Sequence, residues 1–246
     1  MARDLLDLLW RDHPDAPRRG TRGPQAKITT SRAVDAAITL ADTDGLDAVT
    51  VRRLAAHLGV TAMALYPHIG SRDDLLVLMA DAVHGRHAGP AADDNDGWRD
   101  RVRRVAAADL ALYTAHPWLL EVTDPRLALG PGTIAKYDRD LHAFDGTGLS
   151  DVDRDAAGTF VADFVRASAR ARRSAAAAVD MADLWGAWQD RLAAYVGETY
   201  PLARRVGAAA GEAMNTSYSP DAAWAFGLDR VLDALATRMD AAPPPR

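Results

Sequence analysis

Residues 50–75, TVRRLAAHLGVTAMALYPHIGSRDDL, concentrate side chains that can bind a phosphate backbone. Hydroxyl, imidazole and guanidinium groups all donate hydrogen bonds to phosphate oxygens. An arginine can in addition bind the edge of a guanine through two parallel hydrogen bonds. The candidate chemistry of this segment is therefore nucleic-acid binding, and the side chains that carry it are Thr50, Arg52, Thr61, Tyr66, His68 and Arg72.

Two short helices around a tight turn would present these side chains on one surface. The apolar residues of the segment follow a helical period, and they supply the inner faces of the two helices: Val51, Leu54, Ala55 and Leu58 for the first, Val60, Leu65 and Ile69 for the second. Gly59 lies where the chain must reverse, a position that suits a residue free to adopt positive φ. A helix that reads the major groove has to be short, exposed and braced in this way.

Longer helices are expected on both sides of the pair. Val34, Ala37, Ile38 and Ala41 form an i, i+3, i+4, i+7 stripe that ends at Gly45, and Thr30 or Ser31 is placed to cap its start. Ser71 is placed to cap the helix that follows, with acidic residues in its first turn, where the helix dipole favours them.

The whole chain has 246 residues, 48% of them hydrophobic, which suffices for a buried core. It contains no cysteine and carries a net charge of −5, yet residues 18–32 hold Arg18, Arg19, Arg22, Lys27 and Arg32 and no acidic residue. One end of the molecule is thus electropositive. No stretch reaches the roughly 18 consecutive apolar residues of a membrane helix, so we expect a cytoplasmic protein without a membrane partner.

The pattern predicts an all-α fold in two domains. Residues 1–26 form a basic N-terminal extension with a short helix before residue 16, and residues 27–87 form the candidate DNA-binding domain. The Gly-, Pro- and Asp-rich stretch 88–97 is a connector. A larger domain, 97–240, is predicted to contain helices at 97–115, 131–145, 151–172, 180–199 and 221–239, and no run of alternating β-branched residues indicates a sheet.

The segment 50–76 resembles the helix-turn-helix of the tetracycline-repressor (TetR) family of transcriptional regulators, in which an LA-x-x-LGV-[ST] turn precedes LY-x-H. The resemblance covers about residues 28–80 and implies a palindromic operator, a homodimer and a larger domain that binds a small apolar or amphipathic effector of unknown identity. The stretch HPWLLEVTDPRLALGP loosely resembles the C-terminal domain of the same family. The DNA-contacting residues that we predict are Lys27, Thr50, Arg52, Thr61, Ala62, Met63, Ala64, Tyr66, Pro67, His68 and Arg72.

The leading positions of the predicted recognition helix are apolar. Ala62, Met63 and Ala64 offer no side-chain hydrogen bonds, so they can read only shape and thymine methyl groups. We therefore expect Arg52 and the basic arm to carry most of the discrimination, the arm by entering a minor groove. The opposing interpretation is that each outward Arg or Thr is solvated surface, and that the arm only aids solubility.

Two sets of aromatic and apolar residues in the larger domain have helical spacing. The first, predicted to line the effector pocket, comprises Tyr113, His116, Trp118, Tyr137, Leu141, Phe144, Phe160, Phe164 and Ser168. The second, predicted to form the dimer interface from its bundle-like spacing, comprises Trp185, Trp188, Leu192, Tyr195, Leu228, Leu232, Leu235 and Met239. Either set could instead be ordinary core.

The sequence contains none of the common catalytic motifs that we considered. There is no phosphate-binding GK[ST] loop, GxSxG elbow or HExxH pair, and the acidic stretch 93–97 lacks the ligand spacing of a calcium loop. We predict no catalytic residue, no cofactor and no metal. The alternative is an α-helical small-molecule-binding protein or enzyme whose helix-turn-helix arises from packing alone.

Overall fold

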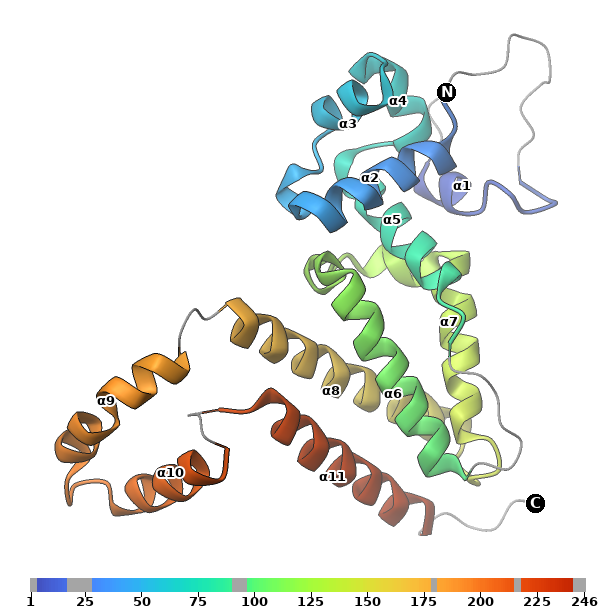
Figure 1. Ribbon diagram of the computed structural model, residues 1–246. Coiled ribbons are helices and arrows are strands. Elements are labelled where there is room, and N and C mark those ends of the chain that lie inside the picture. The colour runs from blue at the N-terminus through green and yellow to red at the C-terminus, as the bar shows by residue number, and fades with distance from the viewer. Residues whose placement is uncertain (1–3, 17–27, 90–96, 178–180, 215–217, 241–246) are drawn as a thin grey trace, which may run out of the picture.

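The computed structural model describes residues 4–16, 28–89, 97–177, 181–214 and 218–240. Those residues contain helices and no strand, which confirms the predicted all-α class. Eleven α-helices follow in order (Figure 1): α1 Leu5–Leu9, α2 Thr30–Asp44, α3 Val51–Leu58, α4 Ala62–Ile69, α5 Arg72–Arg86, α6 Trp98–Ala115, α7 Pro131–Leu141, α8 Asp151–Ala177, α9 Met181–Val196, α10 Pro201–Met214 and α11 Pro220–Asp240. Short 3-10 helices lie at Leu46–Ala48, Pro117–Glu121, Pro125–Leu129 and His142–Phe144 (η1 to η4).

Most helix positions agree with the sequence, and the exceptions have local causes. The helix predicted over 131–145 ends at Leu141 and continues as η4. Helix α10 was not predicted, because Gly207 and Gly211 interrupt its alanine-rich sequence and reduce its helix propensity. The N-cap of α2 is Thr29, whose side chain accepts a hydrogen bond from the Arg32 amide, so the prediction of Thr30 or Ser31 as the cap was wrong.

Capping residues, two buried leucines and a glycine turn define the helix-turn-helix. Thr50 caps α3, and Leu54 and Leu65 are fully buried between α2, α3 and α4. Gly59 ends α3 in the left-handed conformation (φ 68°, ψ 37°), and the Val60 amide donates to the Ala55 carbonyl at 3.0 Å. Ser71 caps α5 in a capping box with Asp74. The turn therefore depends on a backbone conformation that residues other than glycine rarely adopt.

The N-terminal helix α1 lies against the junction between the helix-turn-helix and the rest of the molecule. Its Leu8 and Leu9 are buried, and α1 packs on α5. The Trp10 indole donates to the Leu129 carbonyl in η3 at 2.9 Å, while the Arg11 guanidinium donates to Ser31 in α2 at 3.2 Å. The short helix predicted in residues 1–16 is thus present and contacts both parts of the chain.

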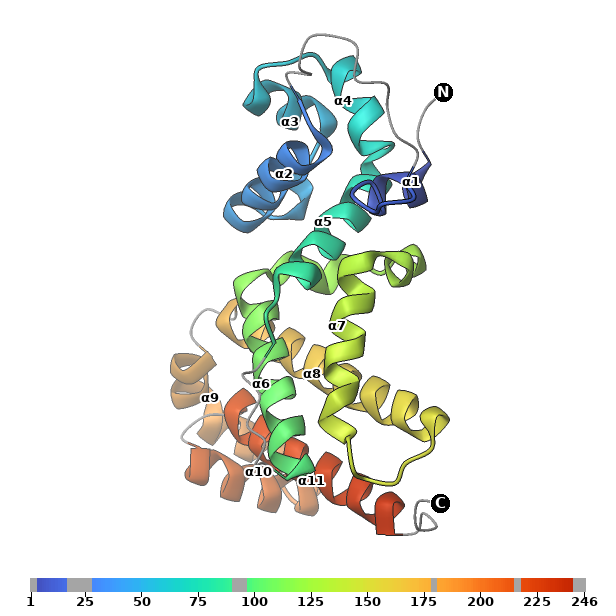
Figure 2. The same cartoon turned by 90° about the vertical axis from the view of Figure 1, so that its right-hand side faces the viewer.

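Helix α5 connects the two parts, and α7 is the helix against which it packs most extensively (Figure 2). The two backbones nearly touch where Gly85 meets Gly132. A Cβ added at Gly132 would lie 2.1 Å from the Asp81 carbonyl oxygen and 2.8 Å from the Gly85 nitrogen. The Asp81 carboxylate accepts a hydrogen bond from the Thr133 amide at 2.8 Å, at the start of α7. Only a residue without a side chain fits position 132 at this crossing.

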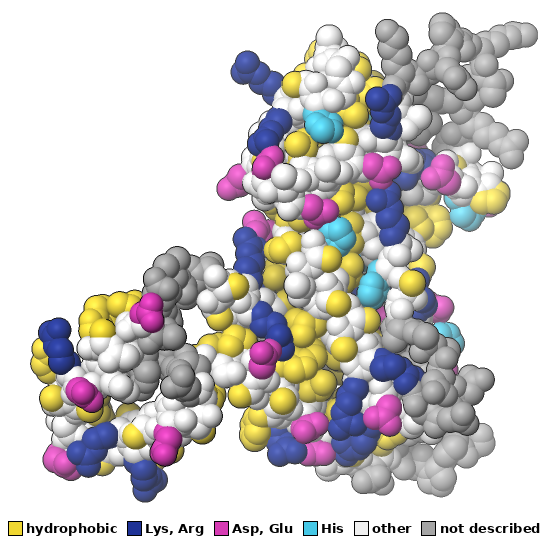
Figure 3. Space-filling view, in the orientation of Figure 1, with side chains coloured by type: hydrophobic (Ala, Val, Ile, Leu, Met, Phe, Trp, Pro, Cys, Tyr) yellow, Lys and Arg dark blue, Asp and Glu magenta, His cyan; other side chains and the backbone are white. Residues whose placement is uncertain are grey.

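The remaining helices form a packed group and an arm. Helix α8 packs between α6 and α11, and α9 with α10 forms a hairpin that projects from this group (Figure 1). Large apolar side chains are exposed on α9 and α10, among them Tyr195 (75%), Leu202 (62%) and Trp188 (56%). Figure 3 shows apolar atoms on the surface of this arm and around α8 and α11. We call α9 and α10 together the arm.

Substitution of Gly59 tests the turn. Gly59→Ala introduces no clash, because no atom lies within 4 Å of the added Cβ. It should still lower the free energy of unfolding by about 1 kcal/mol, since the left-handed conformation costs an L-residue about 1–2 kcal/mol. Gly59→Asn should cost less, because asparagine tolerates this conformation. Urea denaturation measures both; equal stability of Gly59→Ala and the wild type would contradict the assignment of the turn.

Candidate functional site

The predicted DNA-contacting residues within the described part of the chain gather at one end of the molecule. Thr50 and Thr61 are exposed at the starts of α3 and α4, and Tyr66 on α4 is 45% exposed. Figure 3 shows Lys and Arg side chains around this end, where α3 and α4 lie. We call the exposed surface of α3, α4 and their flanking caps the candidate DNA face.

Arg52 is the side chain of this face best placed to reach a base. It is exposed and makes no hydrogen bond or ion pair with another described residue. Its neighbour Arg53 instead pairs with Asp44. An unengaged guanidinium loses no protein contact when it binds a base or a phosphate. The two adjacent arginines therefore form a natural pair for comparison.

Arg72, predicted to bind phosphate, binds backbone carbonyls of its own chain. Its guanidinium donates to the Val49 carbonyl at 3.0 Å and to the Leu46 carbonyl at 3.3 Å. The side chain thus holds the loop before α3 against the start of α5. A role as a phosphate ligand stays a prediction, and the contacts seen are those of a brace for the helix-turn-helix.

The leading turn of α4 is apolar and accessible. Met63 is 75% exposed and Ala64 is exposed, while Ala62 is half-buried. Pro67 is exposed within α4 and His68 is half-buried near its end. Lys27 and the arginines at 18, 19 and 22 lie outside the described residues. The proposed minor-groove role of the basic arm therefore stays a prediction.

Polar contacts of α2 and α5 hold the helices of the DNA-binding domain to the larger domain. Two residues that were predicted to line a pocket take part in these contacts. The Asp42 carboxylate of α2 accepts a hydrogen bond from the Trp118 indole at 2.6 Å and lies 2.8 Å from His116 Nδ1. Trp118 is 2% exposed. On the other side, Arg126 of η3 pairs with Asp74 of α5 at 2.7 Å. His116 and Trp118 therefore join the two domains, and their role in a pocket stays a prediction.

The other predicted pocket residues have different neighbours in the structure, and their role in a pocket stays a prediction. Tyr113 is buried and accepts a hydrogen bond from Arg166 at 3.2 Å, and Phe144 is buried beside a small cavity. Phe164 stacks on Trp224, with ring centroids 5.3 Å apart. Outside these, Tyr137 and Phe160 are exposed, and Leu141 and Ser168 are half-buried. Equal helical spacing therefore does not give these residues a common environment.

The predicted dimer stripe on α11 lies in the core of this chain. Leu228, Leu232 and Leu235 are at most 8% exposed, because α11 packs them against α8 within the same chain. Met239 is half-buried against the same core. On α9, Trp188, Leu192 and Tyr195 are exposed, so the prediction stands for them; the side chain of Trp185 lies outside the described residues.

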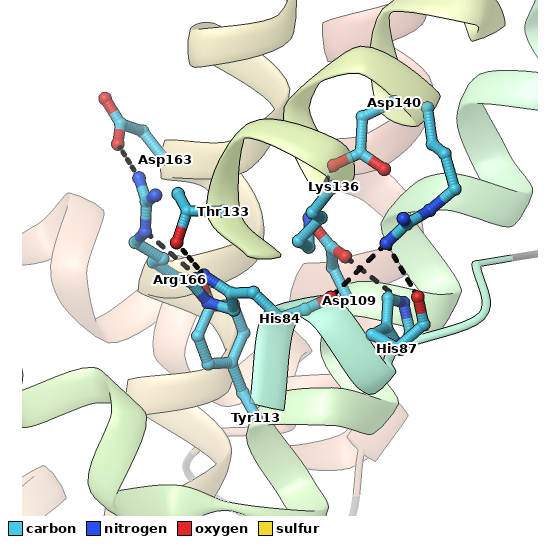
Figure 4. Close-up of polar contacts among 10 residues, drawn as sticks. His84, His87, Asp109, Tyr113, Thr133, Lys136, Asp140, Asp163 and Arg166 are labelled. Carbon is cyan, nitrogen blue, oxygen red and sulfur yellow. Dashed lines mark hydrogen bonds and ion pairs between the residues drawn. The ribbon is translucent and has the colours of Figure 1, made fainter. Parts of the chain in front are cut away.

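A buried polar cluster was missed by sequence reasoning. It lies where α5, α6 and α7 meet (Figure 4), and its central residue is Lys136, whose ammonium donates to Asp109 at 2.7 Å and to Asp140 at 2.5 Å. His84 and His87 complete it from the end of α5. Two signals were available: Lys136 is one of only two lysines in an arginine-rich chain, and Asp109 interrupts the apolar run VAAADLALY.

The cluster shows marked effects of burial on charge. Burial lowers the pKa of His84 to about 3, with further lowering by Lys136, Arg166 and His87. Burial also lowers the pKa of His87 and raises that of Asp140. For Lys136, burial pulls the pKa down but the adjacent Asp109 and Asp140 outweigh it, so the pKa is raised. The cluster therefore holds one ammonium and two neutral imidazoles near neutral pH.

In the described part of the chain, His, Asp and Glu side chains form no group of three that could hold a metal ion. Within the same residues, no helix is long and apolar enough to cross a membrane.

Known proteins share both parts of this architecture. A model of the tetR family of bacterial regulatory proteins matches residues 33–79, and a model of tetracyclin repressor-like C-terminal domains matches residues 90–239. The HTH-type transcriptional repressor DrrR1 of Streptomyces coeruleorubidus is 33% identical over 238 residues, which are 94% of this chain and 84% of that protein. The chain belongs to the TetR family of transcriptional regulators.

Solved TetR-family structures have the same fold. ActR of Streptomyces coelicolor in complex with actinorhodin superposes with a TM-score of 0.71 at 27% identity, covering 88% of this chain and 99% of ActR. BioQ with its natural double-stranded DNA operator superposes with a TM-score of 0.52 at 28% identity, covering 60% of this chain and 88% of BioQ. Both likenesses extend beyond the helix-turn-helix into the larger domain.

The buried histidine makes the stability of this regulator depend on pH. Because the pKa of His84 is lower in the folded than in the unfolded chain, its contribution is lost as the pH falls below about 6.5 toward 3. Between pH 7.5 and pH 5 this group should remove about 2 kcal/mol from the free energy of unfolding. His84→Asn, which can keep the contact with Thr133, should show a correspondingly smaller loss in urea denaturation. Parallel pH profiles of the variant and the wild type would contradict this account.

Proposed function

We propose that this TetR-family regulator is a repressor that binds a palindromic operator as a homodimer and leaves it when a small molecule binds the larger domain. The observation that carries the proposal is the candidate DNA face. An exposed short helix follows a glycine turn, and an unengaged Arg52 lies beside it. The rival, an α-helical enzyme or binding protein without specific DNA affinity, gives no reason for this surface.

Three similar proteins give independent support to this proposal. DrrR1 is a transcriptional repressor, and BioQ has been solved with its natural DNA operator. ActR has been solved with actinorhodin, a small molecule. We infer the same division of labour here: DNA at α3 and α4, and an effector among α5 to α8.

The homodimer is inferred from the exposed apolar surface of the arm and its surroundings. Phe226 on α11 is 69% exposed and Phe160 on α8 is 47% exposed, in addition to the exposed apolar side chains of α9 and α10. Large exposed apolar patches are rare on monomers and are typical of subunit interfaces. A second copy supplies the same surface, and two-fold symmetry then places two recognition helices on two half-sites.

Release by an effector follows from the way the two domains are joined. The DNA-binding helices are fixed to the larger domain through α5 and through the contacts of Asp42 and Asp74. An effector that binds one arrangement of the larger domain more tightly shifts the population toward it. If that arrangement places the two recognition helices at a spacing other than one turn of DNA, about 34 Å, affinity for the operator falls.

Arg52 provides the test of DNA reading. Arg52→Ala should weaken binding to an operator, obtained by selection from random DNA, by about 10-fold or more, because a bidentate contact to a base contributes about 1–3 kcal/mol. Binding to random DNA should weaken much less. Arg53→Ala is the matched control, since Arg53 already pairs with Asp44. Fluorescence anisotropy at fixed salt measures the affinities of the three proteins for both DNAs; equal losses on specific and random DNA would remove the base-reading role from Arg52.

The arm provides the test of dimerisation. Leu192→Glu places a charge on an exposed apolar face of α9 and should convert a dimer into a monomer in sedimentation experiments, because a buried unpaired charge is costly. Operator affinity should fall with it. Ile134→Glu, on the similarly exposed face of α7, should leave the dimer intact. The reverse result, dissociation by Ile134→Glu alone, would place the interface on α7.

A further inference from the structure

Two adjacent residues directly after α1 bind opposite parts of the chain. The Trp10 indole donates to the Leu129 carbonyl of η3, in the larger domain, at 2.9 Å. The next residue, Arg11, donates through its guanidinium to the Ser31 hydroxyl of α2, in the DNA-binding domain, at 3.2 Å. The N-terminal segment therefore joins the two domains by a route that does not pass through α5.

Burial holds this segment in place. Leu8 and Leu9 are 0% and 4% exposed, and α1 packs on α5 (Figure 2). The Arg11 guanidinium also donates to the Leu8 carbonyl at 3.0 Å, at the C-terminal end of α1. A helix of only five residues is unstable on its own in water, because nucleation costs more than its few hydrogen bonds return. Helix α1 therefore owes its structure to its docking at the domain junction.

Helix α2 is attached near both of its ends as a result. Ser31 in its first turn is held by Arg11, and Asp42 in its last turn accepts a hydrogen bond from the Trp118 indole at 2.6 Å. The rise of 1.5 Å per residue in an α-helix separates residues 31 and 42 by about 16 Å. A domain held at one point can pivot about it, whereas two points this far apart restrict its rotation.

The positive charge of Arg11 also acts at the α5–α7 crossing. Asp81, the α5 residue against which Gly132 packs, is 6% exposed. Burial raises the pKa of the Asp81 carboxyl group, and hydrogen bonds from Thr133 together with the charge of Arg11 offset part of this rise. Arg11 therefore favours the ionised form of the carboxylate that receives the start of α7.

We propose that α1 with Trp10 and Arg11 is an interdomain clip, and that Trp10 and Arg11 are positioning residues for DNA binding. The clip fixes the angle of the helix-turn-helix relative to the larger domain, so that the recognition helix is held where an operator requires it. The inference rests on the proposed function, because it assigns these residues a part in operator binding. The clip lies outside residues 33–79 and 90–239, so it is additional to the domains that the family models describe.

The distance between the two domains tests the clip without DNA. Met63 on α4 and Val152 on α8 are 75% and 79% exposed, and the full-length chain has no cysteine, so Met63→Cys with Val152→Cys gives one spin label in each domain. Dilution with unlabelled chain restricts pulsed electron resonance to distances within one chain. Trp10→Ala should broaden this distance distribution by about 2-fold, because the hydrogen bond that crosses the junction is lost.

A matched control and a milder variant complete this test. Trp98→Ala removes an indole that stacks with Arg99 inside the larger domain, and it should leave the distribution unchanged. Trp10→Phe keeps an aromatic ring and loses only the donor, so it should broaden the distribution less than Trp10→Ala and serves if Trp10→Ala does not fold. An unchanged distribution in the folded Trp10 variants, or equal broadening by Trp98→Ala, would overturn the clip.

Operator affinity tests the positioning role. Trp10→Ala should weaken binding to the selected operator about 5-fold but binding to random DNA less than about 2-fold, because two half-sites require a fixed placement of the recognition helices and phosphate contacts alone do not. Trp98→Ala should change neither affinity. Equal losses on both DNAs are expected from a smaller folded fraction, and they would overturn the positioning role. Unchanged or tighter operator binding by Trp10→Ala would overturn it as well.

The two failures are separable. A wild-type chain that binds no operator, but in which Trp10→Ala broadens the distance distribution, overturns the proposed function and leaves the clip. A wild-type chain that binds a selected operator, with the same distance distribution and the same affinity in Trp10→Ala, overturns the clip and leaves the proposed function.

Discussion

The crossing of α5 and α7 is the constraint on which the rest of the structure depends. At this point two helix backbones approach until Gly132 lies against the carbonyl of Asp81, and no side chain at position 132 would fit. Close backbone approach fixes the relative position of two helices more rigidly than contact between flexible side chains. Since α5 begins directly after the recognition helix and ends beside the buried polar cluster, its position determines where α4 points relative to the larger domain.

Three polar contacts reinforce this arrangement at the other end of α5. The Asp42 carboxylate accepts a hydrogen bond from the Trp118 indole, and Asp74 pairs with Arg126. The indole of Trp10, directly after α1, donates to the carbonyl of Leu129. The Trp118–Asp42 hydrogen bond is partly shielded from water, so it gains in strength, and removal of one partner would leave the other unsatisfied. The N-terminal helix α1 lies outside both family-model matches, so this chain has a contact between its domains that those models do not describe.

The sequence predicted local structure well and long-range partnership poorly. The Ser71 cap, the Gly59 turn and the apolar stripes of α2 to α4 were sufficient to place the helix-turn-helix, because each depends on neighbours a few residues away. Asp42 and Trp118 are 76 residues apart in sequence, and no local pattern joins them. The spacing of Leu228, Leu232 and Leu235 is the same whether a helix packs within its own chain or against a partner. Spacing alone therefore does not distinguish a dimer interface from core packing on α11.

The central claim is that the close α5–α7 crossing sets the position of the recognition helices in the proposed dimer. The chain contains no cysteine, and Met63 on α4 is 75% exposed, so Met63→Cys offers a single site for a spin label. Pulsed electron resonance on the DNA-free dimer should give a narrow distribution of label distances near roughly 34 Å, one turn of DNA. Adding Gly132→Ala should displace or broaden that distribution, because the new Cβ meets the Asp81 carbonyl. Superimposable distributions from folded dimers with Gly132 and with Ala at this position would contradict the claim.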